Sequence, residues 1–189
     1  MNKVIGILGG TFDPPHWGHI RLAEHFSGTL QLDELFWLPS GEPWQKGAHI
    51  TPAKDRLDMT IAAADVLKEE LQAKNIDTKV MVDSMEIDRG GPSYTIDTVE
   101  ALKATYPNDK IVLILGTDAH AAIDKWHRSD ELKKLVEVLV IDRPDFPGSP
   151  TLDIDALNIS ATQARAGDFD LLPPAVVTYI KERGLYASK

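Results

Sequence analysis

Short apolar runs alternate with longer amphipathic segments along most of this chain. The runs at residues 4–8, 35–39, 78–85, 111–115 and 136–141 are short and rich in β-branched residues, which predicts strands. Several of them are apolar at consecutive positions, a pattern typical of parallel strands buried on both faces of a sheet. The sequence therefore predicts a parallel sheet with its strands well separated along the chain.

The segments between these runs carry apolar residues at helical spacing. Helices are expected from about His16 through Phe26 and from Pro52 to Leu71, with Arg56 on the polar side of the second helix in a structural role. Further helices are expected at 95–105, from a cap at Ser160, and at 175–183, while 145–158 is expected to be a loop with one short strand. The predicted fold class is α/β: one domain, residues 1–189, with a Rossmann-like doubly wound parallel sheet, helices on both faces and a small C-terminal helical segment.

Composition narrows the classes of protein that remain. The chain has 189 residues, 43% of them apolar, 26% charged, and a net charge of −9, which argues against broad nucleic-acid binding. It has no cysteine, so disulfides, thiol nucleophiles and cysteine-ligated zinc are excluded. No apolar run approaches the length of about 18 residues that a membrane span requires, and no signal segment precedes the first strand. We expect a cytoplasmic protein with no membrane partner.

The strongest candidate for chemistry is the turn that leaves the first strand. Gly9-Gly10 removes side chains that would keep a ligand from the backbone, and Asp13-Pro14-Pro15 predicts a rigid bend before the helix. His16 and His19 are three residues apart and share one face of the first helical turn, where free N–H groups favour anions. Surface decoration or a metal site with a third ligand are the alternative interpretations.

Other polar residues follow predicted strands or begin helices. Lys46, in a loop after the second strand, is either a phosphate contact or a solvated lysine, and Asp118 is either a ribose ligand or a helix cap. Trp126 either packs at the edge of the core or stacks on a base. The start of the helix at 160–165 offers hydroxyls and Arg165, which suit a polyphosphate, although a plain capped helix with a surface arginine is equally compatible.

Three motifs carry a resemblance to a known family. Residues 9–19 resemble the G-G-T-F-D-P-x-H-x-G-H signature of the HIGH-type nucleotidyltransferase superfamily. Together with P-S-Y-T at 92–95 and I-S-x-T-x-x-R at 159–165, they resemble the nicotinate-nucleotide adenylyltransferase family over nearly the whole chain. The family loop P-P-H-K reads Pro-Trp-Gln-Lys at 43–46 here. The histidine that the family uses to contact phosphate is therefore replaced by Gln45.

The resemblance implies a role for each matching residue. The catalytic residues implied are His16, His19, Lys46 and Arg165. The implied ATP-binding residues are Gly9, Gly10, Thr11, Phe12, Gly116, Asp118, Arg143, Ile159, Ser160, Thr162 and Arg165. The mononucleotide is expected at Tyr94, Thr95, Trp126 and Lys46, with its pyridine ring stacked on the indole. No protein side chain is expected to bind metal, and Mg²⁺ is expected to arrive on the phosphates.

The implied reaction is the transfer of the adenylyl group of ATP to nicotinate mononucleotide, which gives nicotinate adenine dinucleotide and pyrophosphate in NAD biosynthesis. Three alternatives stay open: the same enzyme with a preference for nicotinamide mononucleotide, a non-catalytic nucleotide-binding module, and a metal-dependent hydrolase using the two histidines. The expected partners are the two nucleotides, and a homo-oligomer is an open option.

Overall fold

The computed structural model describes residues 2–43, 50–141 and 159–186. Its centre is a five-stranded sheet, all parallel, formed by β1 (Val4–Gly10), β2 (Glu34–Pro39), β3 (Lys79–Val82), β4 (Lys110–Gly116) and β5 (Glu137–Ile141). The strand order is β3-β2-β1-β4-β5, so the chain moves outward in one direction from β1 to β3 and in the other through β4 and β5. This order confirms the predicted doubly wound fold.

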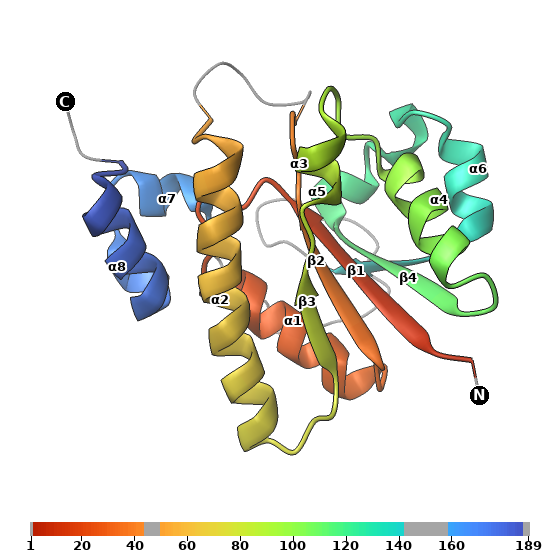
Figure 1. Ribbon diagram of the computed structural model, residues 1–189, viewed down its shortest axis with the longest axis horizontal. Coiled ribbons are helices and arrows are strands. Elements are labelled where there is room, and N and C mark those ends of the chain that lie inside the picture. The colour runs from red at the N-terminus through yellow and green to blue at the C-terminus, as the bar shows by residue number, and fades with distance from the viewer. Residues whose placement is uncertain (1, 44–49, 142–158, 187–189) are drawn as a thin grey trace.

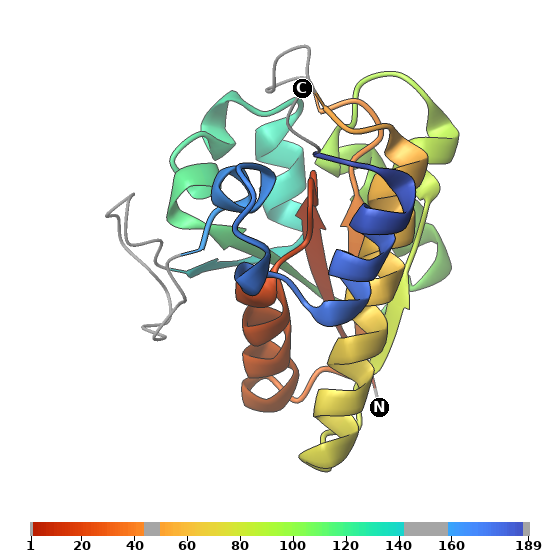
Figure 2. The ribbon, with the colours of Figure 1, turned by 90° about the vertical axis from the view of Figure 1, so that its left-hand side faces the viewer.

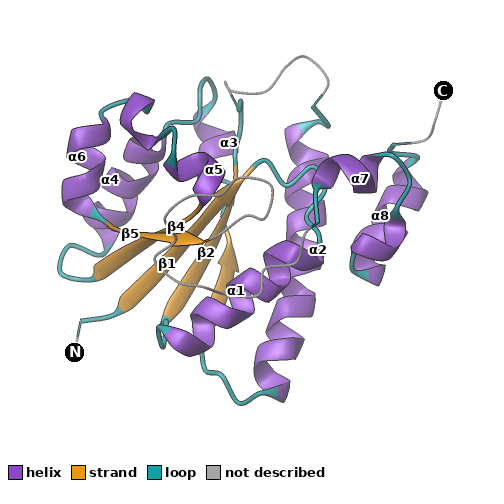
Figure 3. Ribbon diagram, turned by 180° about the vertical axis from the view of Figure 1, so that it is seen from behind, coloured by secondary structure: helices purple, strands orange, loops and turns teal. Residues whose placement is uncertain are grey.

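Helices cover both faces of the sheet (Figures 1 and 3). The helices α1 (Trp17–Thr29) and α2 (Ala53–Ala73) lie on one face, and α4 (Thr95–Thr105) and α6 (Ser129–Leu135) lie on the other. Three short helical pieces connect these layers: α3 (Met85–Arg89), α5 (Thr117–His120) and η1 (Ile123–Lys125). The last part of the chain forms α7 (Ala161–Arg165), η2 (Phe169–Leu171) and α8 (Pro174–Arg183), with α8 packed on the outer side of α2 (Figure 2).

Alternate strand residues build two separate cores because successive side chains of a strand point to opposite faces. Trp37 and Ile114 belong to the core under α1 and α2, while their neighbours Phe36 and Leu113 belong to the core under α4 and α6. Both faces are therefore apolar, which explains why the strands read as nearly continuous apolar runs.

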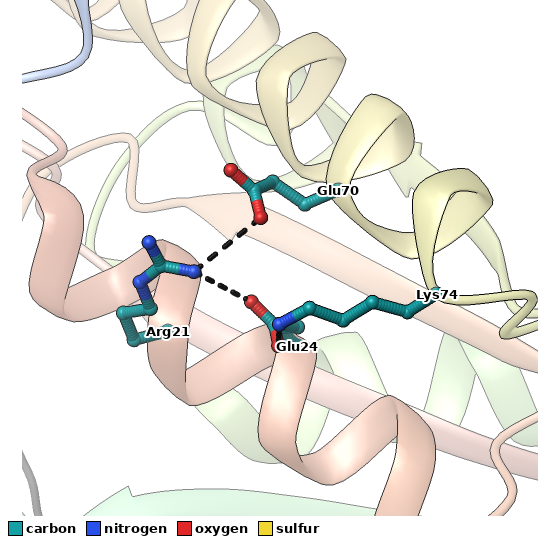
Figure 4. A network of polar contacts seen from close by, with 4 residues as sticks. All are labelled: Arg21, Glu24, Glu70 and Lys74. Carbon is teal, nitrogen blue, oxygen red and sulfur yellow. Dashed lines mark hydrogen bonds and ion pairs between the residues drawn. The ribbon is translucent and has the colours of Figure 1, made fainter.

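Charged side chains join α1 to α2 outside the first core. Arg21 on α1 binds Glu24 at 2.9 Å and reaches Glu70 on α2 at 3.4 Å, and Lys74, directly after α2, binds Glu24 (Figure 4). Exposed pairs of this kind contribute little each, about 0–1 kcal/mol, so the buried core is the main determinant of the helix packing. In the described part of the chain no helix is long and apolar enough to cross a membrane.

Two predictions of local structure were wrong in detail, and one helix was not predicted. The strand predicted at 78–85 spans only Lys79–Val82, because the Asp83 carboxylate accepts the N–H of Met85 at 2.8 Å and starts α3 there. The helix α6 was not predicted; it follows Arg128, which adopts a left-handed conformation at φ 51°. Arg56 is not on the polar side of α2 but 1% exposed. The loop predicted at 145–158 lies outside the described residues.

Candidate active site

A cavity of about 850 Å³ lies at the carboxyl ends of β1 and β4, where the order of the strands reverses. In open α/β sheets this reversal is the usual position of a ligand site. The described residues that the sequence predicted for the site all line it: Gly9, Gly10, Thr11, Phe12, His16, His19, Tyr94, Thr95, Gly116, Asp118, Trp126, Ile159, Ser160, Thr162 and Arg165. Lys46 and Arg143 lie outside the described residues. The fold thus gathers around one cavity residues as far apart in the sequence as Gly9 and Arg165.

The turn after β1 presents its backbone to the cavity. Phe12 adopts a positive φ of 49°, which directs its ring inward, where it is 3% exposed and stacks on Trp37 with centroids 5.7 Å apart. A Cβ at Gly10 would lie 3.0 Å from the Phe12 ring, so the ring would have to shift by a few tenths of an ångström to admit another residue. Phe12 therefore stabilises the turn from the core side, and the glycines leave room on the cavity side.

The two histidines form a stacked pair at the start of α1. His16 precedes the helix in an extended conformation, and its backbone N–H donates to Nδ1 of His19 at 3.1 Å. The rings are 3.8 Å apart between centroids and inclined by 27°, and the Phe12 ring meets His19 edge-on at 5.0 Å. Because Nδ1 of His19 accepts a hydrogen bond, the proton of the neutral ring is on Nε2, which can donate to a ligand.

The start of α7 brings a second set of donors to the same turn. Ser160 caps the helix, since its Oγ accepts the N–H of Gln163 at 3.3 Å while Gln163 Oε1 accepts the N–H of Ser160 at 2.9 Å. Arg165 donates to the carbonyl of Asp13 at 2.6 Å and to Thr162 Oγ1 at 3.0 Å. Arg165 is thus fixed beside the segment that leads into His16, and its charge faces the cavity that the histidines line.

Aromatic rings line another part of the cavity. Tyr94, directly before α4, stacks on His127 with ring centroids 4.4 Å apart and planes inclined by 27°. Trp126, which precedes His127 in the chain, is half-buried, and its indole Nε1 has no hydrogen-bond partner among the described residues. Ser93 does not cap α4 through its side chain; its Oγ accepts the N–H of Gly41 at 2.8 Å and so joins this loop to the one after β2. Flat rings of this kind suit a planar ligand group.

Two buried charged residues support the site region: Arg56, whose structural role was predicted but whose burial was not, and Glu86, which the sequence analysis did not single out. The guanidinium of Arg56 donates to the carbonyls of Thr51, Thr11 and Gly41 at 2.8–2.9 Å, so it joins three loops around the cavity. Glu86 lines the cavity at 8% exposure and accepts a hydrogen bond from Thr98 at 2.9 Å. Burial raises the pKa of Glu86, against the hydrogen bonds from Thr98 and Ser93. No local pattern signals the burial of either residue, because most of their partners lie more than ten positions away in the sequence.

The arrangement combines anion-binding donors with a group of aromatic rings in one cavity. The histidine pair, Arg165 and the open backbone after β1 suit a polyphosphate, and Tyr94, Trp126 and His127 suit a flat ring. Such a cavity can hold two nucleotides with their phosphates facing each other.

Comparisons with known proteins identify the family of the chain. The family model described as "Cytidylyltransferase-like" matches residues 7–167. Proteins of Saccharopolyspora erythraea and Bacillus pumilus, both named "Probable nicotinate-nucleotide adenylyltransferase", are 38% and 35% identical to this chain. The alignments cover 96% and 98% of this chain and 89% and 100% of the two relatives.

A solved structure has the same fold. The Plasmodium falciparum nicotinic acid mononucleotide adenylyltransferase complexed with NaAD superimposes with a TM-score of 0.80 at 21% identity, covering 98% of each chain. At that identity the match shows the fold, and the relatives of higher identity show the family. This chain belongs to the cytidylyltransferase-like family and, within it, to the nicotinate-nucleotide adenylyltransferases.

Proposed function

We propose that this protein transfers the adenylyl group of ATP to nicotinate mononucleotide and so forms nicotinate adenine dinucleotide and pyrophosphate, a step of NAD biosynthesis. The observation that carries the proposal is that the His16–His19 pair and Arg165 line the same cavity as Tyr94 and Trp126. The names of the relatives support the same substrates, as does the NaAD bound in the Plasmodium enzyme.

The reaction needs two anionic groups to be aligned and their charge to be neutralised. An oxygen of the 5′-phosphate of the mononucleotide forms a new bond to the α-phosphorus of ATP, the bond from that phosphorus to the bridging oxygen of the β-phosphate breaks, and pyrophosphate leaves with its electron pair. His16 and His19 donate to the phosphate oxygens whose charge increases in the transition state, and Arg165 and Lys46 neutralise the leaving group. No covalent intermediate with the protein is required.

The remaining residues bind the two nucleotides on either side of the phosphates. The backbone at residues 9–12 admits the triphosphate, Asp118 holds a ribose, and Ser160 and Thr162 contact phosphate together with the backbone at 159 and 116. Arg143 is assigned to adenine binding by the resemblance alone. Thr95, Tyr94 and Trp126 receive the mononucleotide, whose pyridine ring stacks on the indole.

Mg²⁺ is proposed to reach the site on the triphosphate. Among residues 2–43, 50–141 and 159–186 no group of three or more histidine or acidic side chains is arranged to hold a metal ion. The guanidinium of Arg165, which lines this part of the cavity, fits phosphate oxygens rather than a cation. When bound, Mg²⁺ would supply additional neutralisation of the phosphate charge.

The test is an assay of purified protein with ATP, Mg²⁺ and either mononucleotide, in which pyrophosphate and the dinucleotide are measured. We expect a higher kcat/KM with nicotinate mononucleotide than with the amide. A higher kcat/KM with nicotinamide mononucleotide would show that this amide, and not nicotinate mononucleotide, is the preferred substrate. ATP binding without pyrophosphate release would indicate a non-catalytic module. A Trp126→Ala variant should raise the KM for the mononucleotide by about tenfold and leave the KM for ATP nearly unchanged, because a stacked base contributes about 1–3 kcal/mol.

A further inference from the structure

The segment that follows α8 reaches back to the turn that precedes His16. The helix ends at Gly184, which adopts a left-handed conformation at φ 63°, and Leu185 donates its N–H to the carbonyl of Ile180 at 3.0 Å. Tyr186 follows, also at a positive φ of 57°. Its hydroxyl donates to Oδ1 of Asp13, a residue 173 positions earlier in the chain. The end of α8 is therefore shaped to deliver one hydroxyl to the turn after β1.

Asp13 is held at each of its acceptor groups. Its carboxylate is buried, at 5% exposure, and Oδ2 accepts the backbone N–H of Thr51 at 3.2 Å. Thr51 also donates its hydroxyl to the Tyr186 hydroxyl at 3.3 Å. The carbonyl of Asp13 accepts Arg165 at 2.6 Å. One residue thus links the segment after α8, the start of α2 and the arginine of α7.

The position of Asp13 gives these contacts a consequence for the site. Only Pro14 and Pro15 separate it from His16, and prolines transmit a displacement because their φ is fixed. His16 in turn holds His19 through its backbone N–H. Any shift of Asp13 therefore moves both rings and the guanidinium of Arg165.

The hydroxyl of Tyr186 is suited to this contact. Burial raises the pKa of Tyr186, and the hydrogen bond to Asp13 raises it further, so the hydroxyl keeps its proton and remains a donor over the working pH range. A buried carboxylate that lost this donor would destabilise the folded protein or would move toward water. The bond therefore fixes the place of Asp13.

A second tyrosine of the same region provides the comparison. Tyr179, on α8, donates to Asp55 and Asp58 of α2 at 2.9 Å each. None of these three residues lines the cavity. Tyr179 docks α8 onto α2, whereas Tyr186 contacts the segment that carries the site.

We propose that Tyr186 is a positioning residue for adenylyl transfer: by holding Asp13 it sets the places of His16, His19 and Arg165. The part of this inference that concerns kcat rests on the proposed function. The part that concerns the positions of the histidine rings does not rest on it. The alternative is that Tyr186 only docks the end of the chain, as Tyr179 docks α8.

The experiment compares Tyr186→Phe with Tyr179→Phe, because each change removes one hydroxyl that donates to a buried or half-buried aspartate. Three quantities are measured for both variants and the unaltered protein: the thermal midpoint of unfolding, kcat and both KM values, and the ring signals of His16 and His19 in ¹⁵N-histidine NMR spectra, assigned from the single alanine variants.

We expect the thermal midpoint to fall in both variants. In Tyr186→Phe alone, kcat should fall by roughly tenfold with both KM values within about twofold, since displacements of about 1 Å in a site can lower the rate a hundredfold. The ring signals of His16 and His19 should shift in Tyr186→Phe and stay in place in Tyr179→Phe.

Unchanged kcat and unchanged ring signals in folded Tyr186→Phe would overturn the proposal, as would equal losses of kcat in the two variants. If Tyr186→Phe does not fold, Thr51→Val replaces it, since it removes only the hydroxyl that contacts Tyr186, and a smaller change in the same direction is expected. An unaltered protein that forms no pyrophosphate would refute the proposed function, and the ring signals would then decide the positioning role alone.

Discussion

The backbone N–H of His16 donates to Nδ1 of His19, and the two rings stack 3.8 Å apart. Neither ring is positioned independently, because His16, the residue that caps the helix, also orients the ring of His19 three residues later. The two histidines thus form one structural unit, and they are expected to behave as one in catalysis.

The first prediction concerns this unit. His16→Ala and His19→Ala should each lower kcat by roughly a hundredfold or more, the usual effect of removing one donor to a developing charge. The double variant should be little worse than either single one, since groups that act together are not additive. Pyrophosphate release measures the effect, and His120→Ala, at the end of α5 and outside the cavity lining, is the control. Normal turnover in folded His16→Ala or His19→Ala would refute their role.

The second prediction concerns Gly18, where an added side chain would press on the ring of His16. A Cβ at this position would lie 3.0 Å from Cε1 and Nδ1 of the His16 ring, so Gly18→Ala must shift the ring by a few tenths of an ångström. We expect kcat to fall while thermal stability holds or rises, because alanine favours the helix by about 1 kcal/mol. Gly28→Ala in the same helix meets only the flexible end of Ile76, at 3.3 Å, and should keep full activity. A drop in kcat of the same size in both variants would contradict this interpretation.

Arg56 should be a determinant of stability. Arg56→Met replaces the aliphatic part of the side chain but leaves the carbonyls of Thr51, Thr11 and Gly41 without their donor. We expect the free energy of unfolding to fall by about 2 kcal/mol or more, measured with urea. Arg21→Met is the control, because Arg21 is exposed and its ion pairs with Glu24 and Glu70 should contribute less than about 1 kcal/mol. Similar losses in the two variants would argue against the role of Arg56 as a link between loops.

Glu86 predicts a specific dependence of stability on pH. Because burial raises the pKa of Glu86 above its ordinary value of 4.5, the folded protein binds its proton at a higher pH than the unfolded chain does. Above about pH 4.5 the folded state therefore holds more protons, and the contribution of this group to stability falls as pH rises through the folded pKa.

Glu86→Gln removes this titration and keeps an acceptor for Thr98. Measured by urea unfolding at several pH values, its stability relative to the unaltered protein should increase from about pH 4.5 upward and then level off. Glu69→Gln, at an exposed position of α2, should show a difference that does not vary in this way. A relative stability of Glu86→Gln that decreases with rising pH would show that the environment favours the charged form.

The sequence by itself determined the α/β architecture and the local structure of the strongest elements. The helix at Thr95–Thr105 has the predicted bounds, and Ser160 caps a helix as predicted, because hydrophobic spacing and capping depend on residues a few positions apart. The motif around His16 and His19 also indicated where the site lies, since the strand, the glycines and the helix start are contiguous in the chain.

Only the tertiary structure decided which distant residues support that site. Arg56 is read as polar from the pattern of its own helix, yet the loops around it supply three carbonyls and bury it. The hydrogen bond from Thr98 to Glu86 and the hydrogen bond from Tyr186 to Asp13 likewise join separate segments of the chain. These segments meet only when the sheet has formed and α8 is packed on α2. Local propensity acts over one or two turns of chain, whereas burial and hydrogen bonding of these groups depend on long-range packing.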